Sequence, residues 1–337
     1  MNDHSLSAIF FILFCYVFSL VLTIFVRKPL IKRALLDHPN ERSSHKMPVP
    51  RGGGWALLAI LGPGTVLISL YQHSLPFHAW LILALALLVA VSWLDDRHGI
   101  NPFMRLTIHI IAAFFGSMSL APHAMIFNGS IPFWIDRTLL IVGWAWFINL
   151  YNFMDGIDGL TCVETISIAT GACALFSAFN IYDPFVSVLI LMLTGVCLGF
   201  LALNWHPAKI FMGDVGSVPL GFLVGYILLT LALKGHVAAA FILPLYYIAD
   251  SGITLFKRAC RGEKVWQAHR QHFYQKAALG LGRHDRPVYW VIAANISLMS
   301  SALLAALHPL TGLVLAALIV AILLWAMHKA GRNIAAP

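Results

Sequence analysis

Apolar runs of membrane-spanning length recur along the whole chain and exclude most other architectures. Hydrophobic residues make up 60% of the 337 residues, whereas charged residues make up only 11%. In lipid, backbone polar groups must be satisfied within the protein, which favours helices. We expect an all-α, polytopic membrane helix bundle of about eleven spans, each of roughly 20 residues, forming a single domain over residues 1–337. The expected spans are residues 7–26, 54–71, 78–94, 104–121, 138–151, 161–179, 184–203, 216–233, 237–256, 288–307 and 310–327.

The basic residues predict the orientation of this bundle. If the expected spans alternate across the membrane, all but two of the 22 lysines and arginines fall on one side. The two exceptions are Arg137 and Lys234. Such an excess marks the cytoplasmic side, so we expect the N-terminus outside and the C-terminus inside. Because orientation and lipid contact account for the net charge of +8, no nucleic-acid partner is expected.

Five aspartates stand at the cytoplasmic ends of the expected helices, where a carboxylate close to hydrocarbon is costly without a partner. Asp95 and Asp96 end one apolar run, Asp155 and Asp158 lie three residues apart, and Asp214 lies in a glycine-containing turn. A spacing of three places two side chains on one helix face. Taken singly, these groups also fit a solvated helix end or a plain turn. Together they predict a divalent-metal site for phosphate chemistry.

The longest and most basic connection, residues 257–287, contains His269, Arg270 and His272. Because arginine pairs bidentately with phosphate, we expect these three residues to grip a diphosphate. Attraction of the basic loop to anionic lipid is the plainer alternative. No cysteine or third histidine completes a zinc set here. The carboxylates elsewhere favour Mg²⁺, with Mn²⁺ as an alternative.

Several motifs occur in the order found in a known family. They are Arg42-Ser-Ser-His45-Lys46, Asp95-Asp96, Asn152-x-x-Asp155-Gly-x-Asp158-Gly, Phe211-Met-Gly-Asp214-x-Gly-Ser217 and His269-Arg-Gln-His272. With these motifs the chain resembles the polyprenyl-phosphate N-acetylhexosamine-1-phosphate transferases, the superfamily that contains MraY and WecA (glycosyltransferase family 4). The resemblance covers residues 37–276, which is most of the chain.

The resemblance implies a reaction and a cofactor. The phosphate of undecaprenyl phosphate would attack the β-phosphorus of a UDP-N-acetylhexosamine in the presence of Mg²⁺, giving undecaprenyl-diphospho-sugar and UMP. It also implies a bacterial inner-membrane location with the active site facing the cytoplasm, and it leaves a homodimer open. The implied roles are catalysis for Asp95, Asp96, Asp155 and Asp158, metal binding for Asp214, Asp95 and Asp155, and substrate binding for His45, Lys46, Asn152, His269, Arg270 and His272.

Two departures from the family pattern bear on the sugar donor. The muramoyl-pentapeptide branch has three consecutive histidines in the last motif, and a lysine where Arg97 and His98 stand here. The motifs are more similar to those of O-antigen-initiating enzymes, which implies UDP-GlcNAc or a 6-deoxy relative such as UDP-QuiNAc or UDP-FucNAc. The alternatives are the muramoyl-pentapeptide phosphotransferase of peptidoglycan synthesis and a polytopic transporter. A transporter is expected to carry ionisable groups near the midplane of broken helices.

Overall fold

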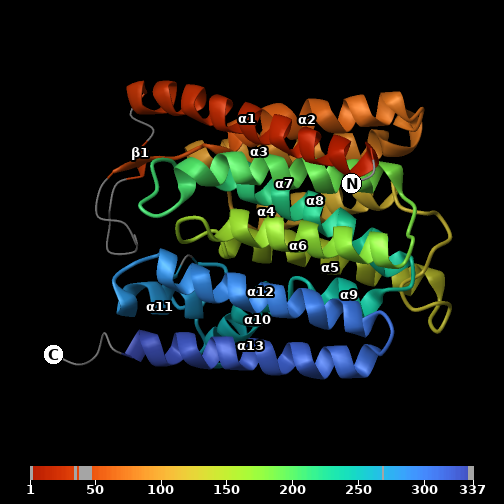
Figure 1. Cartoon of the computed structure of the whole chain (residues 1–337). Helices are drawn as coiled ribbons and strands as arrows, with labels where there is room; N and C mark the ends of the chain where they lie inside the picture. The colour runs from red at the N-terminus through yellow and green to blue at the C-terminus, as the bar shows by residue number, and fades with distance from the viewer. Residues whose placement is uncertain (1–2, 34–35, 38–47, 268, 333–337) are drawn as a thin grey trace.

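The computed structural model describes residues 3–33, 36–37, 48–267 and 269–332. Long helices run side by side through the molecule, and one two-stranded sheet is the only sheet in the described part of the chain (Figure 1). The predicted all-α class is therefore confirmed. The elements are α1 (Asp3–Lys32), β1 (Leu36–Asp37), β2 (Val49–Pro50), α2 (Gly54–Tyr71), α3 (Leu75–His98), α4 (Pro102–Ser117), α5 (Phe133–Phe153), α6 (Leu160–Ala178), α7 (Pro184–Asn204), α8 (Asp214–Leu233), α9 (Val237–Ile242), α10 (Leu245–Cys260), α11 (Phe273–Leu281), α12 (Asp285–Ala305) and α13 (Pro309–Arg332).

Eight helices among the described residues are long and apolar enough to cross a membrane. They are α1, α2, α3, α6, α7, α8, α12 and α13, while α4 is a shorter apolar helix. Helix α5 covers the expected span 138–151 but carries Asp136 in its first turn. The polytopic character is confirmed, and the total of eleven spans stays a prediction.

The expected span 237–256 consists of two helices. Helix α9 ends at Ile242 and α10 begins at Leu245, with Pro244 between them. Proline has no backbone N–H and its ring clashes with the carbonyl four residues earlier, so a continuous helix is interrupted here. The connection 257–287 also differs from the expected loop, because it contains helix α11.

Helix α8 is the most enclosed element of the bundle. Of its membrane-length window, 94% is buried, compared with 17% for α1. It packs against α3, α5 and α9, and it lies between the α1–α2 pair and the α12–α13 pair (Figure 1). Trp144 of α5 stacks on Phe222 of α8 with ring centroids 4.7 Å apart, and its Nε1 donates to the Phe222 carbonyl at 3.1 Å. This packing fixes the position of Asp214, the first residue of α8.

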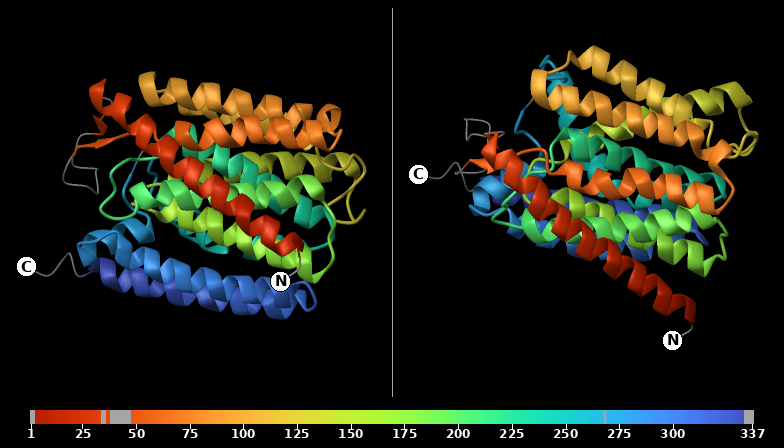
Figure 2. Two further views of the ribbon diagram at one scale, coloured as in Figure 1. Left: turned by 45° about the horizontal axis from the view of Figure 1, so that its top comes forward. Right: turned by 90° about the horizontal axis from the view of Figure 1, so that it is seen from above.

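Helix α1 crosses its neighbours obliquely (Figure 2) and lies against α7 at two glycines spaced four residues apart. A Cβ at Gly195 would meet the Cβ of Cys15 at 2.6 Å. A Cβ at Gly199 would meet the Cβ of Ser19 at 2.7 Å. The Ser19 hydroxyl also donates to the carbonyl of Val196 at 2.7 Å. Small residues at this spacing let membrane helices approach closely, so these glycines set the crossing of α1 over α7.

The connections that contain the predicted site residues gather at one end of the bundle. Figure 1 shows β1 and α11 at this end, on the left. The first connection is closed by the antiparallel pairing of β1 with β2, in which Leu36 lies opposite Pro50. The carboxyl ends of α3 and α5 and the amino ends of α6 and α8 therefore meet at this end of the bundle.

Substitution of Gly199 by alanine is expected to destabilise the bundle, because the added methyl group would push α1 away from α7. Overpacking of this kind costs about 1–3 kcal/mol. The matched control is Gly143→Ala in α5, where an added Cβ meets nothing within 4 Å. Melting temperatures of both variants in detergent would check this. Equal stability of the two variants would contradict the assigned crossing.

Candidate active site

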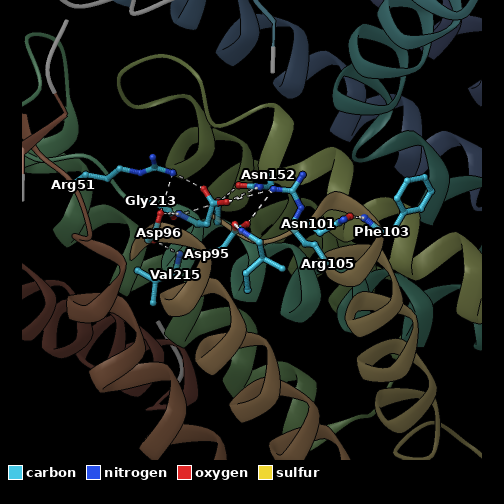
Figure 3. A network of polar contacts seen from close by, with 12 residues as sticks. Arg51, Asp95, Asp96, Asn101, Phe103, Arg105, Asn152, Gly213 and Val215 are labelled. Atoms are coloured by element: carbon cyan, nitrogen blue, oxygen red, sulfur yellow. Dashed lines mark hydrogen bonds and ion pairs between the residues drawn. The ribbon is translucent and has the colours of Figure 1, made fainter. Parts of the chain in front are cut away.

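Three carboxylates converge where α3 ends and α8 begins (Figure 3). The carboxylate of Asp96 accepts hydrogen bonds from the backbone N–H groups of Asp214 at 3.2 Å and Val215 at 3.0 Å. A negative side chain at a helix amino end is favoured by the exposed N–H groups and the helix dipole. Asp95 instead accepts the N–H of Ile100 at 2.6 Å, in the turn that leads to α4. Asp95 and Asp96 are therefore fixed by backbone donors on different segments.

Two arginines pair with the carboxylates of this cluster. Nη2 of Arg51 lies 2.9 Å from Oδ1 of Asp96 and 2.7 Å from Oδ1 of Asp214. Nη1 of Arg105 lies 3.2 Å from Oδ2 of Asp95 and 3.9 Å from Oδ2 of Asp214. The three carboxylates thus alternate with two guanidinium groups, an arrangement that suits a site handling phosphates and a cation.

Asn152, at the end of α5, joins the cluster through Asp214. Its Nδ2 donates to Oδ2 of Asp214 at 3.3 Å, and its Oδ1 accepts the hydroxyl of Ser217 at 2.7 Å. The second bond fixes which end of the amide faces Asp214. Asn152 therefore positions this carboxylate, whereas its predicted role in substrate binding stays a prediction.

Asp155 lies in the α5–α6 connection and is partly buried. The hydroxyl of Thr161 donates to its Oδ1 at 2.6 Å. Burial raises the pKa of Asp155 to about 6, helped by the negative charges of Asp214 and Asp96, while the Thr161 hydroxyl and Arg51 oppose the rise. Asp155 thus shares the electrostatic field of the cluster and is poised to change its charge near neutral pH.

Asp158 belongs to a different set of contacts. Its Oδ2 lies 2.7 Å from Nδ1 of His206 and accepts the N–H of Ala208 at 3.2 Å, and its Oδ1 lies 3.0 Å from Nδ1 of His284. Burial opposes ionisation, but these hydrogen bonds outweigh it and hold the pKa of Asp158 below its ordinary value. Asp158 therefore joins the amino end of α6 to the α7–α8 connection and to the start of α12.

The chemistry of the donors indicates where a cation would bind. Asp158, His206 and His284 offer three ligand atoms within 4.8 Å of one another. However, the distances of 2.7 and 3.0 Å from the carboxylate to the imidazoles are those of hydrogen bonds, which satisfy both partners. Asp96 and Asp214 instead present carboxylate oxygens to a single positive group. An all-oxygen set of this kind fits Mg²⁺.

The histidine-containing segment is organised by Asp250, a residue that is 0% exposed. Oδ1 of Asp250 lies 3.2 Å from Nδ1 of His272 and accepts the N–H of Phe273 at 3.0 Å, and its Oδ2 accepts the N–H of Tyr274 at 3.1 Å. Asp250 therefore caps α11 and orients His272. The ring of His269 stacks on that of His272, with centroids 4.8 Å apart.

Arg270 and His269 differ in charge. Nε and Nη2 of Arg270 are enclosed and have no hydrogen-bond partner among the described residues. Burial lowers the pKa of His269 to about 4, with help from the electrostatic influence of the neighbouring His272 and Arg258. His269 is therefore neutral at physiological pH. Arg270 is the member of this motif with unsatisfied donors for an anion.

The structure adds four residues to the site that the sequence did not single out. Arg51 and Arg105 were apparent only as members of basic loops, although Arg51 stands directly before a run of glycines and Arg105 closely follows the paired aspartates. His206 and His284 gave no local signal, because they meet Asp158 only in the fold. His45 and Lys46 lie outside the described residues.

Asp158→Asn is expected to lower the thermal stability of the protein, because loss of the buried charge weakens three hydrogen bonds. The cost is about 1–3 kcal/mol at neutral pH. A depressed pKa means that the folded state prefers the ionised carboxylate. The stabilisation is therefore present above the ordinary value of 3.8 and is lost as the pH falls through the lower folded value.

Melting temperatures of the wild type and Asp158→Asn across a pH series would measure this effect. The gap between them should be widest at neutral pH and should narrow in acid. A gap of constant size at all pH values would show that the charge of Asp158 does not stabilise the fold.

Comparison with known proteins places this arrangement in a family. The family model described as glycosyl transferase family 4 matches residues 78–232, which include all five predicted aspartates. The chain is 30% identical over 309 residues to the undecaprenyl-phosphate alpha-N-acetylglucosaminyl 1-phosphate transferase of Escherichia coli (strain K12), covering 85% of this chain and 80% of the relative.

Two further relatives agree. The chain is 26% identical over 282 residues to a probable undecaprenyl-phosphate N-acetylglucosaminyl 1-phosphate transferase of Bacillus subtilis (strain 168), covering 78% of this chain and 75% of the relative. It is 30% identical over 223 residues to the decaprenyl-phosphate N-acetylglucosaminephosphotransferase of Mycolicibacterium smegmatis (strain ATCC 700084 / mc(2)155), covering 59% of this chain and 54% of the relative. The chain therefore belongs to glycosyl transferase family 4, in the MraY/WecA-like superfamily that its motifs predicted.

Proposed function

We propose that this chain transfers an N-acetylhexosamine-1-phosphate unit from a UDP-sugar to undecaprenyl phosphate. The names of the Bacillus subtilis and Escherichia coli relatives support this reaction. The observation that carries the proposal is the convergence of Asp95, Asp96 and Asp214 with Arg51 and Arg105 at one end of a membrane bundle. Preorganised charges of both signs suit a reaction between two phosphates, whose catalysis is mainly positioning and charge stabilisation.

In the proposed reaction, an oxygen of the lipid phosphate attacks the β-phosphorus of the donor. A P–O bond forms to the lipid phosphate, the bond from the β-phosphorus to the oxygen bridging the α-phosphate breaks, and UMP leaves with that oxygen. Asp214 would hold Mg²⁺ together with Asp96, in place of the Asp95 and Asp155 that the resemblance implied beside it, because Asp96 and Asp214 share one positive group. The ion, when bound, would supply positive charge to the phosphate oxygens. Asn152 keeps Asp214 in place, and Arg105 compensates the charge of Asp95.

Proton abstraction is a minor requirement in this reaction. A phosphate monoester has a second pKa of about 6, so the acceptor is largely ionised at neutral pH. Asp95 and Asp155 are therefore proposed to control charge and position rather than to act as strong bases. Asp158 acts at a distance from the phosphates, by fixing the start of α6.

The donor diphosphate is proposed to bind the guanidinium of Arg270, in the segment that precedes α11. Its Nε and Nη2 are enclosed and have no hydrogen-bond partner among the described residues. His269 and His272, one neutral and one oriented by Asp250, would add hydrogen bonds to the same group. His45 and Lys46 are proposed to contact the nucleotide, because they match the family's first cytoplasmic motif.

The proposed donors are UDP-GlcNAc and its 6-deoxy relatives UDP-QuiNAc and UDP-FucNAc, in the initiation of O-antigen or another cell-envelope polysaccharide. The motif at residues 269–272 supports these donors over a peptidoglycan precursor. The site is proposed to face the cytoplasm at the bacterial inner membrane, because the basic residues accumulate on the side of the paired aspartates.

A donor screen tests the reaction. Purified protein, Mg²⁺ and undecaprenyl phosphate should release UMP with at least one UDP-N-acetylhexosamine, and EDTA should abolish the release. Product with UDP-MurNAc-pentapeptide alone would support the muramoyl-pentapeptide alternative. Donor movement across vesicles without UMP release would support the transporter alternative.

Asp214→Asn and Asp96→Asn should each lower kcat by about 100-fold to 1,000-fold, since each removes charge at the reacting phosphates. Asp183→Asn is the matched control. Asp183 accepts the N–H of Val186 at 3.0 Å and so caps the amino end of α7, whereas the carboxyl end of α7 leads to Asp214. Asparagine caps helices equally well. Similar loss of activity in all three variants would contradict a specific role for the cluster.

A further inference from the structure

Arg51 belongs to the charge cluster, but the proposed reaction gives it no step of its own. One nitrogen of its guanidinium, Nη2, contacts both Asp96 and Asp214, at 2.9 and 2.7 Å. These are the two carboxylates whose oxygens are proposed to hold the metal ion. The Arg51 side chain is 44% exposed, whereas the carboxylate side chains are 13% and 16% exposed. One long, partly exposed side chain thus pairs with two carboxylates that are more enclosed than itself.

The backbone around Arg51 is fixed from both directions. The N–H of Phe211 donates to the carbonyl of Pro50 at 2.8 Å, and the N–H of Gly53 donates to the carbonyl of Phe211 at 2.8 Å. The N–H of Gly54 continues the pattern to the carbonyl of Met212 at 2.9 Å. Because the main chain is held on either side, a change at this position is confined to the Arg51 side chain.

A divalent cation and this guanidinium compete for the same oxygens. Mg²⁺ requires oxygen ligands at about 2.0–2.1 Å in an octahedral arrangement. Positive groups this close repel each other strongly in a partly enclosed site. A metal ion bound by both Asp96 and Asp214 therefore requires Arg51 to give up at least one of its two contacts.

Arg105 is a contrasting case at the same site. Its side chain is only 18% exposed, it pairs with Asp95 at 3.2 Å, and it stays 3.9 Å from Asp214. Its Nε is enclosed without a partner among the described residues. Arg105 is therefore the more enclosed of the two arginines, whereas Arg51 is the more exposed and its backbone is held by main-chain bonds.

We propose that Arg51 is an exchangeable counter-ion: it pairs with Asp96 and Asp214 when they hold no metal ion, and it is displaced by the incoming divalent cation toward the donor diphosphate. This inference rests on the proposed function, because it assumes that these two carboxylates bind the cation. Arg51 would then couple metal binding to donor binding, because the metal ion releases the guanidinium and the donor diphosphate then binds it.

The test measures metal affinity separately from turnover. Mn²⁺ is titrated into purified protein in detergent, with no donor or acceptor present, and the free Mn²⁺ is followed by its electron paramagnetic resonance signal. Arg51→Gln should bind Mn²⁺ about tenfold more tightly than the wild type, because a competing charge is removed; partial exposure keeps the effect moderate. Arg51→Lys should be intermediate, because it keeps a single-point charge.

The matched control is Arg97→Gln. Arg97 lies on the same end of α3, is exposed, and places its guanidinium 4.5 Å from the ring centroid of Trp93. This control should leave Mn²⁺ affinity unchanged. In turnover assays, Arg51→Gln should also raise the KM for the UDP-sugar, because the freed guanidinium is no longer there to bind the diphosphate. Melting temperatures establish that each variant is folded.

Unchanged or weaker Mn²⁺ binding by folded Arg51→Gln would overturn the exchange. An unchanged KM for the donor would overturn the transfer of Arg51 to the diphosphate. Asp214→Asn separates these results from a failure of the proposed metal site. If Asp214→Asn still binds Mn²⁺, or if no variant binds it, the proposed metal site is wrong. If only Asp214→Asn loses Mn²⁺ binding, the metal site stands and the results for Arg51→Gln test the exchange alone.

Discussion

Compensation of negative charge at the end of an apolar bundle is the constraint on which the site depends. Asp95, Asp96 and Asp214 would repel one another if left unpaired so close together. Two arginines and the backbone N–H groups at the start of α8 stabilise them instead. Because three carboxylates face two guanidinium groups, an excess of negative charge remains that a metal ion would offset, while an anionic substrate would compete for the arginines.

The fold supplies this balance by placing helix ends, not helix centres, at the site. The burial of α8 and its stacking on Trp144 hold Asp214 in register with the end of α3. Asp158 and Asp250 stabilise connections at the same end of the bundle. Asp158 accepts hydrogen bonds from two separate segments, and Asp250 accepts the N–H groups at the start of α11.

The helices were predictable because apolar length is a local property of the sequence, and a helix lies over each expected run. The break at Pro244 follows from a local rule, but α11 has only 9 residues and lies in a basic connection, so its apolar residues do not form a run of membrane-spanning length. The convergence of the aspartates followed from membrane topology. The arginine partners of the aspartates could not be predicted in this way. Arg51 and Asp214 are 163 positions apart, and their pairing depends on tertiary packing.

The main-chain bonds between residues 50–54 and 211–212 have a consequence for substitutions at position 51. They use no side-chain atoms, so the backbone that carries Arg51 is held against the segment before Asp214 without any help from the arginine itself. Exchange of this arginine for another residue would therefore alter the charge beside Asp214 and leave the frame of the two segments intact.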